Sequence, residues 1–162
     1  MVLYSLVSEN ISGKKFKEFL LYCLENATYF SITVPNSNIN FPELEDFFYK
    51  KICTYTWFYY KTYKQPLNII LYHSSPKMLL DILNYFDCLF PESECVNKME
   101  DICFFNDTDI ILGSVTHEGI AKVLLQGDMD IISYEKFAEW EKNEINSRDY
   151  EFFPRLKNFI EG

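Results

Sequence analysis

The chain has 162 residues, a formal net charge of −9 and a hydrophobic content of 48%. This length suits one domain with a sizeable core, and so much apolar sequence excludes a disordered chain. The negative charge argues against nucleic-acid binding, and no run approaches the roughly twenty apolar residues that predict a membrane-spanning helix.

The first half of the chain alternates between strand and helix signals. Within residues 14–26, Phe16, Phe19, Leu20 and Cys23 recur at the spacing of one helical face. In chain order, the predicted elements are a strand over 2–7, a helix over 14–26, a strand over 29–34, a helix from Asn40 through Ile52, a strand over 67–73 and a helix from Ser75 through Phe86.

Residues 54–63 (TYTWFYYKTY) lie between two of these elements and fit two structures. Their aromatic side chains favour a strand, but they can also continue the preceding helix.

The second half predicts a β-hairpin followed by further elements. Strands over 102–105 and 110–115 flank the turn 106–109 (NDTD). A strand over 120–125 follows. Ser133 is expected to cap a longer helix that reaches Glu144, and a short helix is expected over 154–160.

Alternating strands and helices predict an α/β fold: a single domain over residues 1–162, with helices packed on a mixed sheet. The strands of the first half are expected to be parallel, with the hairpin as an antiparallel edge. An α+β arrangement is the alternative.

The chain has two histidines, His73 and His117, around which a catalytic motif could be built. His117-Glu118 begins like a zinc-protease motif, but the second histidine that such a helix needs is replaced by Ala121. Glycine-rich phosphate loops are also missing from the sequence. We therefore expect no catalytic residues, no metal site and no cofactor, and keep a small metal- or His-dependent enzyme using His73 or His117 as the alternative.

The five cysteines form no CxxC pair and are odd in number. An odd set without metal spacing suits reduced thiols better than a disulfide framework. The N-terminal residues also lack the basic flank of a secretory signal. The sequence therefore predicts a cytoplasmic protein.

Acidic residues are concentrated in one stretch of the chain. Residues 1–91 carry eight acidic and eight basic residues, whereas residues 92–151 carry fifteen acidic and five basic ones. A surface of one sign selects a partner of the opposite sign. The residues expected to contact a basic protein are Glu92, Glu94, Asp107, Asp109, Asp128, Asp130, Glu135, Glu139 and Trp140.

Small size, acidity, reduced thiols and the lack of catalytic motifs together resemble the immunity proteins of bacterial toxin–immunity systems. The resemblance is one of general character, without a shared motif. It implies a non-catalytic protein that neutralises a basic, nuclease-type toxin, with no nucleic-acid or membrane partner. The alternative binding function is an adaptor or homodimer that uses the aromatic segment 54–63.

Overall fold

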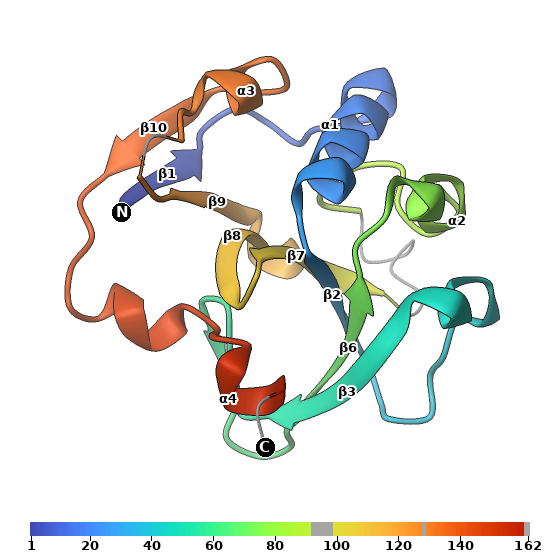
Figure 1. Cartoon of the computed structure of the whole chain (residues 1–162). Coiled ribbons are helices and arrows are strands. Elements are labelled where there is room, and N and C mark those ends of the chain that lie inside the picture. Colours follow the sequence, from blue (N-terminus) through green and yellow to red (C-terminus); the bar gives the residue numbers. More distant parts are fainter. Residues whose placement is uncertain (92–98, 128, 161–162) are drawn as a thin grey trace.

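One antiparallel sheet organises the molecule (Figure 1). The computed structural model describes residues 1–91, 99–127 and 129–160. Within these residues the main sheet has eight strands, in the order β10-β1-β9-β8-β7-β2-β6-β3. The strands are β1 (Val2–Leu6), β2 (Tyr29–Val34), β3 (Phe48–Thr54), β6 (Leu67–His73), β7 (Glu100–Asn106), β8 (Asp109–Val115), β9 (Ile120–Leu125) and β10 (Trp140–Asn143).

The prediction of a single-domain sheet with helices packed on it is confirmed, but the expected parallel pairing is wrong. Each pairing between described strands is antiparallel. The alternating pattern was misleading for a topological reason. β1 and β2 run in the same direction, as strands linked by a helix usually do, but β7, β8 and β9 from the second half lie between them.

Helices cover one face of the sheet. The helices on this side are α1 (Gly13–Asn26), the 3₁₀ helices η1 (Pro42–Phe47) and η2 (Pro76–Met78), α2 (Leu79–Leu83) and α3 (Ile132–Glu135). The predicted apolar face of α1 is confirmed, because Phe16, Phe19, Leu20 and Cys23 are all buried. They pack in a core with residues of the sheet such as Phe104.

The opposite face is covered by the aromatic segment and the C-terminal residues. Its elements are the small hairpin β4 (Thr56–Trp57) and β5 (Tyr60–Lys61), the 3₁₀ helix η4 (Asp149–Phe152) and α4 (Lys157–Ile160). Segment 54–63 is therefore neither a long strand nor a helix. Trp57 and Phe58 are buried against the sheet, whereas Tyr63 is 81% exposed.

Two predicted helices are wrong over most of their length. The helix expected from Asn40 through Ile52 is only η1, followed by β3, and the helix expected from Ser133 is the one-turn α3, followed by β10. In both cases the chain adds an edge strand, to β6 and to β1 respectively. Backbone N–H and C=O groups at the edge of a buried strand need partners, and this pairing outweighs a helical pattern in the sequence.

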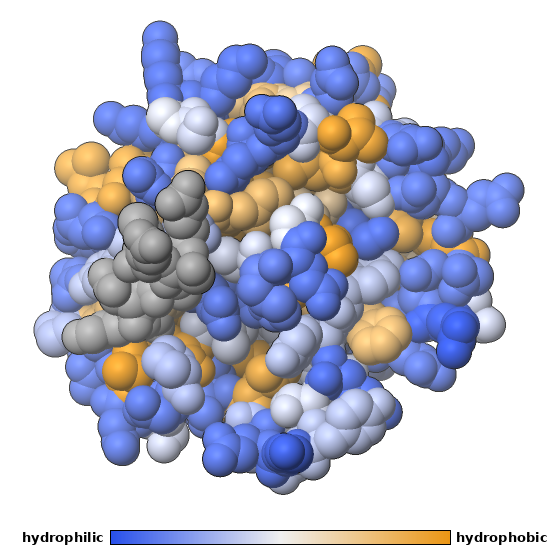
Figure 2. Space-filling model, turned by 180° about the vertical axis from the view of Figure 1, so that it is seen from behind, coloured by the Kyte–Doolittle hydropathy of each residue, from blue (hydrophilic) through white to orange (hydrophobic). Residues whose placement is uncertain are grey.

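The other elements agree with the sequence pattern to within a few residues, and the short 3₁₀ helix η3 (Thr116–Glu118) joins β8 to β9. No helix in the described part of the chain combines the length and apolarity needed to cross a membrane. Seen from behind, the surface is mostly hydrophilic, with small groups of apolar side chains between the polar ones (Figure 2).

Candidate functional site

The predicted partner-binding residues do not gather on one surface. Glu92, Glu94 and Asp128 lie outside the described residues. The other six form two groups, one at the turn between β7 and β8 and one along α3 and β10. All of their acidic members are exposed.

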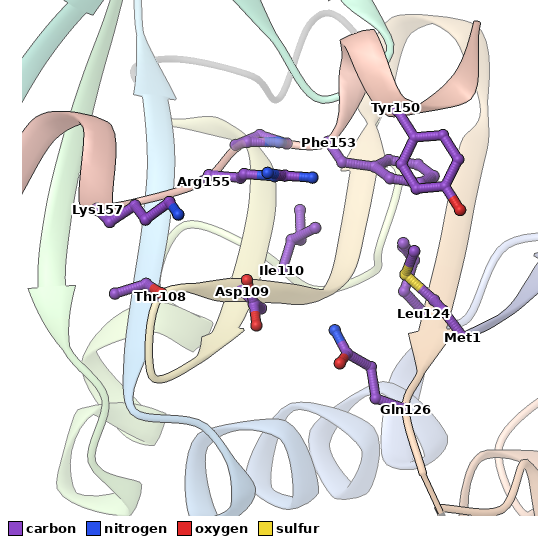
Figure 3. Close-up of a pocket in the computed structure, with 11 residues that line it drawn as sticks. Met1, Thr108, Asp109, Ile110, Leu124, Gln126, Tyr150, Phe153, Arg155 and Lys157 are labelled. Atoms are coloured by element: carbon purple, nitrogen blue, oxygen red, sulfur yellow. The ribbon is translucent and has the colours of Figure 1, made fainter. Parts of the chain in front are cut away.

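The first group consists of Asp107 and Asp109 at the β7–β8 turn. Asp107 has a positive φ of 56°, and its N–H donates to Thr28 Oγ1 at 2.9 Å. Asp109 shares a pocket of about 250 Å³ with Arg155 and Lys157, which come from the C-terminal segment (Figure 3). Cations of the same chain therefore offset part of the negative charge at this turn.

The second group occupies what we call the α3–β10 surface, defined by Asp130, Glu135, Glu139, Trp140, Glu141 and Glu144. Glu135 and Glu139 line a groove of about 440 Å³ together with Glu9, Lys15 and Lys136. Asp130 Oδ1 accepts a hydrogen bond from the N–H of Ile132 at 3.1 Å, at the start of α3.

Trp140 is the aromatic member of the α3–β10 surface. Its indole Nε1–H donates to the carbonyl of Tyr134 at 3.0 Å, and the two rings meet edge to face at 6.2 Å. The side chain is half-buried, so it is held in one orientation beside the exposed carboxylates.

Strand register separates Asp109, in the first group, from Trp140, in the second. β8 begins at Asp109, and the register through β9 leads from this end to Val2, where β1 begins. Trp140 pairs instead with Leu6, the last residue of β1. At about 3.3 Å per residue, roughly 13 Å of strand separates the two ends, so one small interface patch is not expected to be centred on both.

Most acidic side chains of the described residues form no ion pair. Among the described residues, the pairs within 4.0 Å are Lys14–Glu18 and His117–Glu118. None of the carboxylates on the α3–β10 surface belongs to either pair. Their charges are therefore exposed to solvent and are not neutralised by an ion pair among the described residues.

The two histidines lie at opposite ends of the sheet. His73 is opposite Tyr29 at one end of β2, and its ring packs on Tyr29 and Tyr49. His117 lies in η3, near Glu100, which pairs with Thr33 toward the other end of β2. A site that uses both histidines is not formed.

His117 instead converges with two carboxylates. Ligand atoms of Glu100, Asp101 and His117 all lie within 4.8 Å of one another. Asp101 Oδ1 accepts from the N–H of Thr116 at 2.7 Å, and the N–H of Asp101 donates to Thr116 Oγ1 at 3.0 Å. These reciprocal bonds join the start of β7 to the end of β8.

Burial shapes the acidity of this cluster. The pKa of Asp101 is raised by desolvation, although the hydrogen bonds from Thr116 lower it. The pKa of Glu100 is also raised, first by desolvation and then by the neighbouring charge of Asp101, while His117 lowers it. The charge of Asp101 thus disfavours ionisation of Glu100 in a poorly hydrated position.

His117 was a candidate site residue from the sequence, whereas Glu100 and Asp101 were not. The signal that could have found them is the predicted hairpin itself. Glu100 and Asp101 precede its first strand and His117 follows its second, so pairing of the strands brings the three residues to the same open end.

A scan against protein-family models, a search of curated proteins and a search of solved structures found no match to this chain.

Proposed function

We propose that the chain is a non-catalytic protein-binding domain that acts as a cytoplasmic immunity protein. Its partner is a basic, nuclease-type toxin. The docking site is the α3–β10 surface.

The observation that carries this proposal is an exposed set of unpaired carboxylates beside an open sheet edge. Residues 130–144 contain five acidic and two basic residues, Lys136 and Lys142, so their local charge is 2 − 5 = −3. The five carboxylates are exposed, and none takes part in an ion pair among the described residues.

The open edge adds a second means of binding. β10 is the last strand of the sheet and pairs with β1 on one side. Its outer backbone groups can accept an extended segment of a partner, while the carboxylates attract basic side chains of that segment. The groove beside Glu135 and Glu139 offers further space for such side chains.

Opposite charge chiefly affects how fast the partners meet. An anionic surface facing a cationic one raises association rates about ten- to a thousandfold at low salt. A nuclease cleft is cationic because its substrate is a polyanion. An inhibitor whose carboxylates enter that cleft binds the nuclease faster and also blocks access of its substrate.

The test has two stages. First, the chain is co-expressed with proteins encoded beside its gene, and growth is measured. We expect growth arrest caused by one of these proteins to be relieved. If no toxic neighbour is relieved, the immunity function is wrong.

Second, binding of that toxin is measured for the wild type and for the variant Glu135→Gln/Glu139→Gln/Glu141→Gln/Glu144→Gln. We expect association at low salt to slow about tenfold or more, with a flatter salt dependence. The matched control, Asp107→Asn/Asp109→Asn at the β7–β8 turn, should bind like the wild type. If the control slows association and the first variant does not, the docking site includes the β7–β8 turn and not the α3–β10 surface.

A further inference from the structure

Two carboxylates and an imidazole meet where β7 begins and β8 ends. Glu100 and Asp101 come from β7, and His117 comes from η3, directly after β8. The ligand atoms of the three side chains lie within 4.8 Å of one another. They are distant in sequence but are brought together by one hairpin.

The burial of Asp101 adds to the case for a bound cation. This residue is only 8% exposed, and its Oδ1 accepts one hydrogen bond, from the N–H of Thr116. Among the described residues, no Lys or Arg lies within 4.0 Å of the carboxylates of Asp101 or Glu100. Buried carboxylates in proteins are normally paired with a cationic side chain or bound to a metal ion, because burying an isolated charge is costly.

The backbone and the carboxylate of Asp101 are held in place by the sheet and by Thr116. The register between β2 and β7 shifts between Ser31 and Thr33, and Asp101 lies in this β-bulge with a positive φ of 52°. The reciprocal hydrogen bonds with Thr116 fix its backbone and its carboxylate. The ring of Tyr60 packs edge-on against His117, with centroids 5.2 Å apart.

We propose that Glu100, Asp101 and His117 bind a divalent transition-metal ion such as Zn²⁺. Imidazole nitrogen together with carboxylate oxygen suits first-row transition metals, whereas Ca²⁺ and Mg²⁺ prefer ligand sets made of oxygen alone. Three protein ligands leave at least one coordination position open to water or to a group of a partner. This site is independent of the proposed immunity function and of the α3–β10 surface.

The geometry requires only a modest adjustment of side chains. Two ligand atoms that each lie about 2.1 Å from one ion are roughly 3 to 3.5 Å apart. Asp101 is held by Thr116, so the side chains of Glu100 and His117 must move to bring the three ligand atoms closer together. The side chain of His117 is 49% exposed and Glu100 is half-buried, which leaves both able to rotate toward Asp101.

The test is calorimetric titration of Zn²⁺ into the purified full chain. All proteins carry Cys53→Ser, Cys88→Ser and Cys95→Ser, because thiolates also bind zinc. We expect one Zn²⁺ per chain with micromolar or tighter affinity. His117→Ala should weaken binding by at least about tenfold, as should the isosteric Glu100→Gln, because each removes a ligand.

His73→Ala is the matched control, since His73 is the other histidine of the chain and lies at the opposite end of β2. It should leave Zn²⁺ affinity unchanged. Zn²⁺ should also raise the melting temperature of the parent protein, which carries only the three cysteine substitutions, and of its His73→Ala variant, but not that of its His117→Ala variant, because an ion that binds the folded state stabilises it. Absence of Zn²⁺ binding, or binding that survives both His117→Ala and Glu100→Gln, would overturn the proposal.

Discussion

The ring of Phe58 lies directly against the backbone of Gly113. A Cβ placed on Gly113 would come within 2.5 Å of Phe58 Cδ2, so the hairpin β4–β5 can approach the sheet only where β8 has no side chain. Gly113 is therefore required for packing rather than for an unusual backbone angle.

Gly113→Ala is expected to destabilise the protein by about 1–3 kcal/mol, because the buried Phe58 must move to make room for the methyl group. Urea unfolding followed by circular dichroism measures this loss. The double variant Gly113→Ala/Phe58→Leu is the control. Since the smaller side chain relieves the clash, Gly113→Ala should cost less in that background, and equal costs in both backgrounds would contradict the packing explanation.

The reciprocal hydrogen bonds between Asp101 and Thr116 predict a second effect. Thr116→Val keeps the shape of the side chain but leaves the buried N–H of Asp101 without its acceptor. We expect a loss of about 1–3 kcal/mol in the free energy of unfolding. Thr116→Ser retains the hydroxyl group and should recover most of this loss. If Thr116→Ser is as unstable as Thr116→Val, the hydrogen bond to the Thr116 hydroxyl is not the source of the stability at this position.

Because of Tyr134, the stability of the fold should decrease at alkaline pH. Burial, followed by the nearby Cys23 and Tyr22, raises the pKa of Tyr134 above its ordinary value of 10.0. The contribution of Tyr134 to the free energy of unfolding is fully present below pH 10. It is lost as the pH rises above 10, because the unfolded chain releases the phenolic proton while the folded chain retains it.

Tyr134→Phe should therefore weaken the decline in stability above pH 10, as measured by chemical denaturation at a series of pH values. Tyr63→Phe, at an 81% exposed position, serves as the control and should follow the wild type. A Tyr134→Phe variant with an unchanged pH dependence would show that other groups govern alkaline unfolding.

The carboxylates of the α3–β10 surface are expected to contribute little to folding. Glu139→Gln and Glu141→Gln remove charges that are exposed and make no ion pair among the described residues. Each should change the free energy of unfolding by no more than about 0.5 kcal/mol. Urea unfolding at neutral pH checks this. A loss well above that value would mean that these residues are structural, and that impaired binding in their variants has another cause.

Local sequence patterns predicted an element correctly where the spacing of its own apolar residues, or a short turn, defines it. The apolar face of α1, the strand β6 and the β7–β8 hairpin all follow from residues close together in the chain. Hydrophobic periodicity states which face of an element is buried, and turn residues state where it reverses.

Local patterns did not predict the edge strands. β3 and β10 become strands because β6 and β1 offer unpaired backbone groups there, and the residues 48–54 and 140–143 do not themselves indicate those neighbours. Likewise, the separation of Asp109 from Trp140 follows from register, which joins residues that are distant in the chain.

The sign of the charge, the buried face of α1 and a sheet covered by helices follow from the composition of the sequence and the short-range spacing of its residues. Three features depend on the folded chain: which carboxylates lie together, which histidine meets Glu100 and Asp101, and which strands form the edges of the sheet. Long-range strand pairing is driven by the hydrogen-bonding needs of a neighbouring backbone, and a local sequence pattern does not specify that neighbour.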